Sequence, residues 1–376
     1  NHSGDISPTG SQMPRLLGLA QASKVYRNLK THNDDLFSKN GNEIAWGTIG
    51  NASTSEGMFF ETLNAAGVMQ VPMVISVWDD EYGISVSNKD QTVKESISEA
   101  LKGFQRTDAA AGFEIITVKG WDYLALIDAY QFASKIARQD HVPVLVHVTE
   151  LTQPLGHSSS GSHERYKSKE RLNWEKKHDC NDIMRAWMIA EGIAKESELV
   201  QIENDAKKSV KVSRKNAWNA YKAPIIKEKE QLLAFLNVLK TQTHNDTKLQ
   251  VIFSNLDKVI DLGYKDIISA GRQIKMILVK YPDAQVNEFI NWLVKLTSFV
   301  SDRISSHLYT VSKKELLAFK TVPAIYNDNS QLVDGRVIIR DNFELLLKKH
   351  DNLLIFGEDV GKIGDVNHGL EGLQTK

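Results

Sequence analysis

The first 150 residues alternate short apolar runs, rich in Val and Ile, with segments that carry apolar residues at helical spacing. The runs with strand character cover residues 43–49, 71–77, 113–118 and 143–148. The helical segments cover residues 11–30, 55–68, 93–104 and 122–137. Strands that consist of continuous apolar runs are typical of a parallel sheet with both faces covered by helices. The alternation therefore predicts a doubly wound α/β domain.

The remainder of the chain has a different character. Charged tracts rich in helix formers at residues 202–221, 226–240 and 287–300 predict a helical region with little strand content. A third segment predicts a helix at 336–349, then a short buried strand at 353–356 that leads into a Gly-rich loop. We therefore expect three parts: an α/β domain at 1–165, a helical region at 166–330, and the truncated start of a second α/β domain at 331–376. On this interpretation the chain is a fragment of a longer polypeptide.

Charge and cysteine content narrow the classes of function. The 46 Lys and Arg residues balance 47 Asp and Glu residues, which argues against a general nucleic-acid or membrane-surface binder. No apolar run approaches the roughly 20 residues of a membrane span. The single cysteine, Cys180, cannot form an intramolecular disulfide, so we expect a reducing compartment such as the cytoplasm and a structural rather than reactive thiol. The basic stretch 207–215 is interpreted as a solvated helix face, with a contact patch for an acidic partner as the alternative.

The stretch Gly50-Asn51-Ala52-Ser53-Thr54-Ser55-Glu56-Gly57 joins a predicted strand to a predicted helix. Small residues in such a turn allow backbone amides to approach a ligand closely. The helix that follows presents its positive end to an anion such as a diphosphate. Turns of this composition are also common as plain connections, so the pattern alone leaves both interpretations open.

A second group of polar residues follows the strand at 71–77, in the sequence Trp78-Asp79-Asp80-Glu81-Tyr82-Gly83-Ile84-Ser85. Carboxylates at the end of a strand suit a hard cation, because Mg²⁺ prefers oxygen ligands and often shares them with a bound phosphate. In open α/β sheets, ligands bind outside the carboxyl ends of the strands. The two strand ends together could hold one metal diphosphate.

This pair of motifs resembles the thiamine-diphosphate fingerprint of the first component of 2-oxo acid dehydrogenase complexes. That fingerprint is Gly-Asp-Gly followed some thirty residues later by Asn-Asn, and here Asp80 lies 29 positions after Asn51. The resemblance implies a Mg²⁺ ion held by the side chains of Asn51 and Asp80 and by the backbone carbonyl of Tyr82. It also implies a thiamine-diphosphate site formed by Gly50, Asn51, Ala52, Ser53, Asp80, Tyr82 and Ile84.

The sequence departs from the family pattern at three places. Asn51 stands where the family usually has Asp or Glu, Ala52 replaces the second Gly, and Asp79-Asp80 replace Asn-Asn. One amide and one carboxylate remain, with their positions exchanged. We expect the exchange to preserve the cation site; the alternative is a site that has lost cofactor binding.

Two further segments resemble the same family. The loop at 6–14 resembles the entry to the cofactor domain, which in branched-chain members binds a monovalent cation, implying a K⁺ site at Ser7, Pro8, Ser11 and Gln12. An ordinary N-capped helix is the alternative there.

The loop Gly156-His157-Ser158-Ser159-Ser160-Gly161-Ser162 resembles the active-site loop of the same family. The resemblance implies a catalytic His157, and histidine is a residue type that moves protons near neutral pH. The serines resemble a loop that is regulated by phosphorylation in some relatives, but the acidic residues that normally follow are absent here, so we do not expect that modification.

The resemblance implies oxidative decarboxylation of a 2-oxo acid with acyl transfer to a lipoyl group, in an enzyme most similar to the branched-chain type. The alternatives are a pyruvate or acetoin dehydrogenase component and a non-catalytic scaffold. Residues 334–372 resemble the opening of the partner β chain, which implies a fused α-β polypeptide. The expected partners are the remaining α and β domains, in a homodimer of fused chains, and a lipoyl acyltransferase core. Alone, this chain is expected to be inactive, because half of the composite site would be missing.

Overall fold

The computed structural model describes residues 8–29, 37–153, 155–156, 163–243, 246–279, 281, 284–305 and 320–376. The chain divides into two compact units, Asn1–Lys195 with Asn329–Lys376, and Glu196–Asp328. These units differ from the expected boundaries at 165/166 and 330/331. Residues 166–195, expected in the helical region, belong to the first unit, and the C-terminal segment is grouped with that unit as well.

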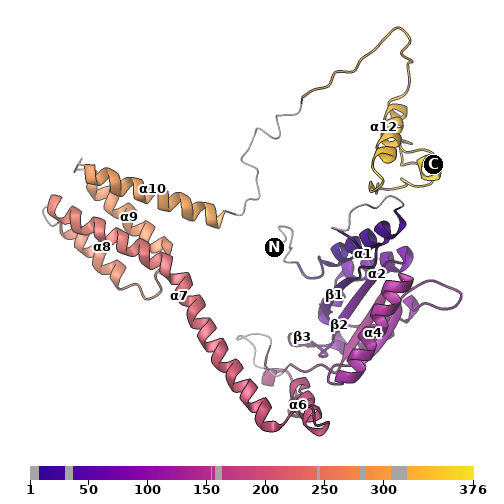
Figure 1. Ribbon diagram of the computed structural model, residues 1–376, viewed down its shortest axis with the longest axis horizontal. Coiled ribbons are helices and arrows are strands. Elements are labelled where there is room, and N and C mark those ends of the chain that lie inside the picture. Colours follow the sequence, from indigo (N-terminus) through magenta and orange to yellow (C-terminus); the bar gives the residue numbers. More distant parts are fainter. Residues whose placement is uncertain are drawn as a thin grey trace. The chain divides into compact units, whose positions relative to one another are not determined.

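A four-stranded sheet forms the centre of the first unit (Figure 1). Its strands are β1 (Ala45–Gly50), β2 (Met73–Trp78), β5 (Glu114–Lys119) and β6 (Val144–Thr149), in the order β1-β2-β6-β5. All three pairings are parallel. Each strand begins and ends within two residues of its predicted position. The parallel α/β architecture predicted from the apolar runs is confirmed.

Helices cover both faces of this sheet, as Figure 1 shows. Along β2, Met73, Ile75 and Val77 pack with helices α1 (Met13–Asn28) and α2 (Gly57–Met69). Val74, on the opposite face, packs with helix α4 (Tyr123–Asp140). Because successive strand residues point to opposite faces, a strand buried on both sides is apolar at nearly every position, and Ser76 is the one polar residue of β2. This burial accounts for the nearly unbroken apolar run.

One predicted helix is wrong. Residues 93–104 form three short pieces instead, the 3₁₀ turns Val93–Glu95 and Lys102–Phe104 flanking helix α3 (Ile97–Ala100). The physical reason is that Lys94 and Glu95 have positive φ angles of 64° and 56°, which interrupt a right-handed helix. The chain becomes helical again at Ser96, whose side chain accepts a hydrogen bond from the Glu99 amide.

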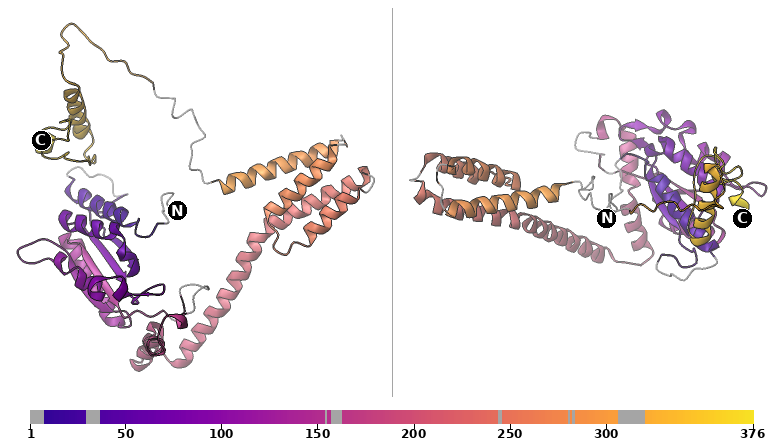
Figure 2. Two further views of the ribbon diagram at one scale, coloured as in Figure 1. Left: turned by 180° about the vertical axis from the view of Figure 1, so that it is seen from behind. Right: turned by 90° about the horizontal axis from the view of Figure 1, so that it is seen from above.

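Four helices form the core of the second unit, and its described part contains no strand. They are α7 (Glu196–Gln242), α8 (Thr247–Asp257), α9 (Tyr264–Leu278) and α10 (Ala284–Ile304). The predicted tracts 202–221 and 226–240 are one continuous helix, α7, with Pro224 inside it (Figure 2). Its second half packs with α8, α9 and α10 around a core that includes Leu232, Leu236 and Phe289. Among the described residues, no helix has the length and apolarity needed to cross a membrane.

The C-terminal segment contains helix α12 (Gly335–Lys349), as predicted, but the predicted strand at 353–356 is wrong. Leu354 is 44% exposed and Phe356 is 75% exposed. A buried strand needs a neighbouring strand to pair with, and no described strand pairs with these residues. The apolar run therefore remains an irregular, partly exposed segment.

Candidate active site

The carboxyl ends of β1 and β2 meet at one edge of the sheet. Gly50 and Trp78 are register partners at the last position of each strand. The Asn51 amide donates to the Trp78 carbonyl at 3.0 Å, and the Asp79 amide donates to the carbonyl of Val148 in β6 at 2.9 Å. The two predicted motifs therefore leave the sheet side by side.

A buried amide links the two motifs. The Asn51 Nδ2 donates to Asn88 Oδ1 at 2.7 Å, and the Asn88 Nδ2 donates to both Asp79 oxygens at 3.0 and 3.2 Å. All three residues are less than 10% exposed. Because the nitrogen end of the Asn51 amide faces Asn88, its Oδ1 is the end suited to a cation.

Asp79 is held from the other side by a buried histidine. The His147 Nε2 lies 2.9 Å from Asp79 Oδ2, and its Nδ1 lies 3.0 Å from the hydroxyl of Ser98 in α3. A carboxylate only accepts hydrogen bonds, so Nε2 carries the proton. Burial by itself would raise the pKa of Asp79, but hydrogen bonds from His147, Asn88 and the Glu81 amide together hold the pKa below its ordinary value. Asp79 is therefore an ionised carboxylate whose two oxygens already have donors within the protein.

Asp80, the next residue, has a different environment. It is half-buried, and its Oδ1 accepts a hydrogen bond of 3.3 Å from the Tyr82 amide. Burial raises the pKa of Asp80, the charge of Asp79 adds to the rise, and the Tyr82 amide and the nearby Lys167 ammonium only partly offset it. A bound cation would stabilise this carboxylate in its charged form. Both Asp79 oxygens already accept hydrogen bonds from the protein, whereas Asp80 accepts one long hydrogen bond. Asp80 is therefore better suited than Asp79 to be the predicted Mg²⁺ ligand.

The predicted ligand set contains few carboxylates. Among the described residues, no group of three or more His, Cys, Asp or Glu side chains could hold a metal ion. A cation at this edge of the sheet would therefore depend on one carboxylate, the Asn51 amide oxygen and the Tyr82 carbonyl, with further oxygens from its ligand. This arrangement suits Mg²⁺, which commonly binds one or two carboxylates and shares the oxygens of a phosphate.

Tyr82 and Ile84 lie in a short antiparallel hairpin formed by β3 (Tyr82–Gly83) and β4 (Val86–Ser87). Ile84, in the turn, has a φ of 59°, although a β-branched residue rarely adopts a left-handed conformation. The hairpin is anchored at its base, where the Asn88 amide donates to the Glu81 carbonyl at 2.9 Å. The same Asn88 thus fixes both Asp79 and the hairpin that carries the Tyr82 carbonyl.

Gly83 allows this hairpin to approach the turn after β1. A Cβ atom at Gly83 would lie 2.6 Å from the Ala52 Cβ, whereas a Cβ at Gly50 meets nothing within 4 Å. We expect Gly83→Ala to lower the free energy of unfolding by about 1 to 3 kcal/mol, because the Ala52 Cβ cannot move without its backbone. The matched control Gly50→Ala should change it by less than about 0.5 kcal/mol. Urea unfolding curves of the two variants test this expectation, and equal stabilities would contradict the close approach.

The segment after the predicted active-site loop clamps the Asp80 loop. Arg171, in helix α5 (Lys169–Lys177), donates from Nη2 to the Asp80 carbonyl at 3.0 Å and pairs through Nη1 with the Glu81 carboxylate. Its Nε donates at 2.9 Å to the buried Glu175, which also accepts from Lys167 at 2.7 Å. Arg171 thus connects the backbone of a predicted metal ligand to a buried ion-pair network.

We expect Arg171→Ala to destabilise the first unit by about 1 to 3 kcal/mol, because three charge-assisted hydrogen bonds are lost around a mostly buried side chain. The exposed Arg165 supplies a matched Arg→Ala control, with an expected change below about 0.5 kcal/mol. Thermal unfolding followed by circular dichroism compares the two. An Arg171→Ala variant as stable as the Arg165→Ala variant would show that the clamp contributes nothing.

The other predicted site residues are only partly described. Ser7 and His157 lie outside the described residues, so the catalytic role of His157 remains a prediction. Pro8, Ser11 and Gln12 precede α1, and the Pro8 carbonyl accepts hydrogen bonds from the Ser11 hydroxyl at 2.8 Å and from its amide at 3.2 Å. A monovalent cation at this loop also remains a prediction.

Four residues of this site were not identified from the sequence: Ser98, His147, Asn88 and Arg171. A histidine inside an otherwise apolar strand, as in Val144-Leu145-Val146-His147-Val148, was a usable signal, since a buried polar side chain needs a partner. Asn88 and Arg171 lie in polar segments, where the residue types alone do not distinguish them from exposed neighbours.

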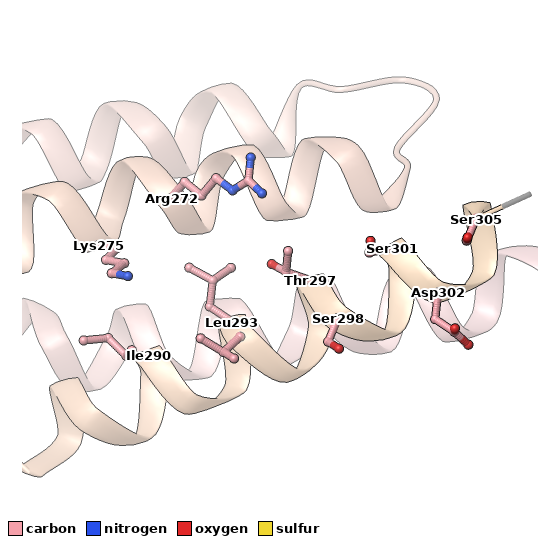
Figure 3. Close-up of a pocket in the computed structure, with 10 residues that line it drawn as sticks. Arg272, Lys275, Ile290, Leu293, Thr297, Ser298, Ser301, Asp302 and Ser305 are labelled. Atoms are coloured by element: carbon pink, nitrogen blue, oxygen red, sulfur yellow. The ribbon is translucent and has the colours of Figure 1, made fainter. Parts of the chain in front are cut away.

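A separate hollow lies in the second unit, between α9 and α10 (Figure 3). It has a volume of about 670 Å³, with Arg272 and Lys275 on one side and Ile290, Leu293 and a row of hydroxyl-bearing residues on the other. It contains none of the predicted site residues, and its mixed lining indicates no particular reaction.

The family model and the curated relatives that match this chain name the same kind of protein, an E1 component of a dehydrogenase. Residues 3–226 match the model of the family described as "Dehydrogenase E1 component". The mitochondrial 2-oxoisovalerate dehydrogenase subunit alpha of Dictyostelium discoideum is 26% identical over 221 residues, which cover 58% of this chain and 45% of that protein. The pyruvate dehydrogenase E1 component subunit alpha of Rickettsia bellii is 26% identical over 208 residues, which cover 54% and 55%. The chain thus spans about half the length of the curated relatives it matches.

Among solved structures, a transketolase from Campylobacter jejuni shares 19% sequence identity over 46% of this chain and 26% of its own, with a TM-score of 0.31. At that score the likeness adds nothing to the fold described above.

Proposed function

The chain belongs to the dehydrogenase E1 component family, and from this membership we propose that it binds thiamine diphosphate and Mg²⁺ and takes part in the oxidative decarboxylation of a 2-oxo acid. The observation that carries the proposal is the edge of the sheet where Asn51 and the Asp79-Asp80 pair leave adjacent strands. Bound thiamine diphosphate would supply the nucleophilic carbon and the electron sink that decarboxylation requires.

The chain's own residues would bind and orient the cofactor. Asn51, Asp80 and the Tyr82 carbonyl would hold the cation, and the cation would hold the diphosphate. The open space beside Gly50 and Gly57, where an added Cβ meets nothing within 4 Å, leaves room for phosphate oxygens near the start of α2. Asp79 would not bind the cation but would fix Asn88, and through it the hairpin and the Asn51 amide.

His157 would serve as the group that moves a proton or donates to a developing oxyanion near the substrate. A histidine is suited to both roles near neutral pH. Its part in the proposal is supported by the resemblance of the loop at 156–162 to the family's active-site loop.

For the substrate we propose a branched-chain 2-oxo acid, with pyruvate as the second candidate. The curated relatives include proteins named for 2-oxoisovalerate and proteins named for pyruvate, at similar identity. The resemblance of residues 6–14 to the cation-binding loop of branched-chain members supports the first. The proposal includes a β-type partner domain, a lipoyl acyltransferase core and a reducing compartment such as the cytoplasm.

The test is turnover of a panel of 2-oxo acids by this chain assembled with the remaining α and β domains, with thiamine diphosphate, Mg²⁺ and an artificial electron acceptor. We expect 2-oxoisovalerate to exceed pyruvate in kcat/KM by about tenfold or more, a range that hydrophobic pockets achieve for small differences in side-chain size. A preference for pyruvate would move the assignment to the second candidate. No turnover of any member, with no cofactor bound, would favour a non-catalytic scaffold.

A further inference from the structure

The first half of helix α7 lies outside the core of the helical unit. All residues from 200 to 221 are exposed, whereas Ile225, Leu232, Leu236 and Leu239 further along the same helix are buried. Figure 2 shows α7 continuing as a single helix beyond the part that packs with α8, α9 and α10. Exposure on all sides leaves this half of the helix without tertiary packing, which is the main source of helix stability in proteins, and a partner helix would supply it.

The charges on this exposed half are separated into two blocks. Residues 196–205 contain four acidic and no basic side chains: Glu196, Glu198, Glu203 and Asp205. Residues 206–215 contain five basic and no acidic side chains: Lys207, Lys208, Lys211, Arg214 and Lys215. The helix dipole favours acidic residues in the first turn and basic residues in the last turn. It does not explain the basic block, because α7 continues to Gln242, far beyond Lys215.

An apolar stripe runs through both blocks. Ile202, Ala206 and Val210 are spaced four residues apart and therefore lie on one face of the helix. Ile202 is 57% exposed and Val210 is 67% exposed. The stripe is centred on a small residue, Ala206, which allows a second helix to approach closely.

We propose that this half of α7 pairs with the same segment of a second copy of the chain, antiparallel and about a two-fold axis at Ala206. In that register Ile202 lies opposite Val210 of the second copy, and Val210 opposite its Ile202. Positions 205 and 207, and positions 198 and 214, lie at the same height along the pair, so the acidic block of each copy runs beside the basic block of the other. The interface is self-complementary, as a two-fold interface must be.

The charge pattern selects this arrangement over the others. In a parallel pair, acidic residues would face acidic residues and basic residues would face basic residues, which is unfavourable. The pairing uses only residues of α7 and does not depend on the proposed cofactor site. Because most of these charges stay near solvent, the association should weaken as salt shortens the range of the interaction.

Disulfide trapping in the full chain tests the register. In a Cys180→Ser background, which removes the only cysteine, Ala206→Cys should form a disulfide-linked dimer under mild oxidation. Ala220→Cys is the matched control on the same exposed helix: in the proposed pair its two copies lie roughly 40 Å apart along the axis, given a rise of 1.5 Å per residue. Equal crosslinking at the two positions, or none at Ala206→Cys, would overturn the proposal.

Charge exchange in the full chain tests the chemistry. One variant carries Lys at positions 196, 198, 203 and 205; a second carries Glu at positions 207, 208, 211, 214 and 215. Each variant alone should self-associate about tenfold or more weakly than the natural chain in sedimentation equilibrium, because like charges then face each other. An equimolar mixture should recover the association. A mixture that associates no more tightly than its components would overturn the proposal, as would a natural chain that stays monomeric while binding an acidic peptide.

Discussion

Replacing Asp80 with Ala is expected to weaken Mg²⁺-dependent binding of thiamine diphosphate by at least about 100-fold. Loss of a residue that only hydrogen-bonds to a metal ligand commonly costs about 10- to 100-fold in metal affinity, and loss of the ligand itself should cost more. Asp80 supplies the one charged oxygen in the predicted ligand set, and a cation beside it would offset the burial that raises the pKa of its carboxyl. Isothermal titration of the chain assembled with the remaining α and β domains, with and without Mg²⁺, measures the effect.

Asp80→Asn is the matched control. It keeps an oxygen at the same position and restores the residue type that the family usually carries there, so binding should be weakened much less than in Asp80→Ala. If Asp80→Ala binds the cofactor as tightly as the unaltered chain, Asp80 is not a ligand.

Replacing Asp79 with Ala is expected to act on stability, lowering the free energy of unfolding by about 2 to 4 kcal/mol. The fully buried His147 and the buried Asn88 would each lose a charge-assisted hydrogen bond and find no water in its place. Asp90→Ala, at an exposed position close in sequence, is the control and should change stability by less than about 0.5 kcal/mol. Urea unfolding followed by far-ultraviolet circular dichroism compares the variants.

The same carboxylate makes stability depend on pH. Because the pKa of Asp79 is lower in the folded chain than in the unfolded chain, its contribution is present in full above the unfolded pKa. It is lost as the pH falls through the lower folded value. The difference in stability between the unaltered chain and Asp79→Ala should therefore shrink in acid, and a difference that grows as the pH falls would contradict the assigned direction.

The fold of the first unit was predictable because its two central strands, β2 and β6, are buried on both faces. That burial favours apolar residues at nearly every position and leaves a mainly apolar run in the sequence, as at residues 73–77, where Ser76 is the one polar residue. The predicted strand at 353–356 has the same kind of run but no neighbouring strand. An apolar run shows that a segment can be buried, but it does not show whether a neighbouring strand is present to pair with it. The helix break at Lys94 and Glu95 depends on positive φ angles, which residues other than glycine seldom adopt. The hydrophobic pattern of the sequence therefore does not predict it.

Only the candidate ligands of the site were predictable from the sequence, not the residues that hold them in place. Asn51 and Asp80 follow strand ends, and strand ends are where the topology of an α/β sheet gathers ligands. The supporting contacts come from distant parts of the chain: Asn88 reaches back to Asn51, and Arg171 in α5 reaches Asp80 across 91 residues. Residue type alone does not distinguish Asp79 from Asp80, and the resemblance is what assigns Asp80 as the ligand. In the structure, the burial of Asp79 against His147 gives a physical reason to separate the structural carboxylate from the candidate ligand.

The position of a bound metal tests the central claim most directly. Crystals of the chain assembled with the remaining α and β domains, grown with thiamine diphosphate and Mn²⁺ in place of Mg²⁺, would locate the ion by its anomalous scattering. We predict one peak within coordination distance, on the order of 2 Å, of Asn51 Oδ1, an Asp80 carboxylate oxygen and the Tyr82 carbonyl oxygen. A peak coordinated by Asp79, or a bound cofactor with no ion between Asn51 and Asp80, would contradict it.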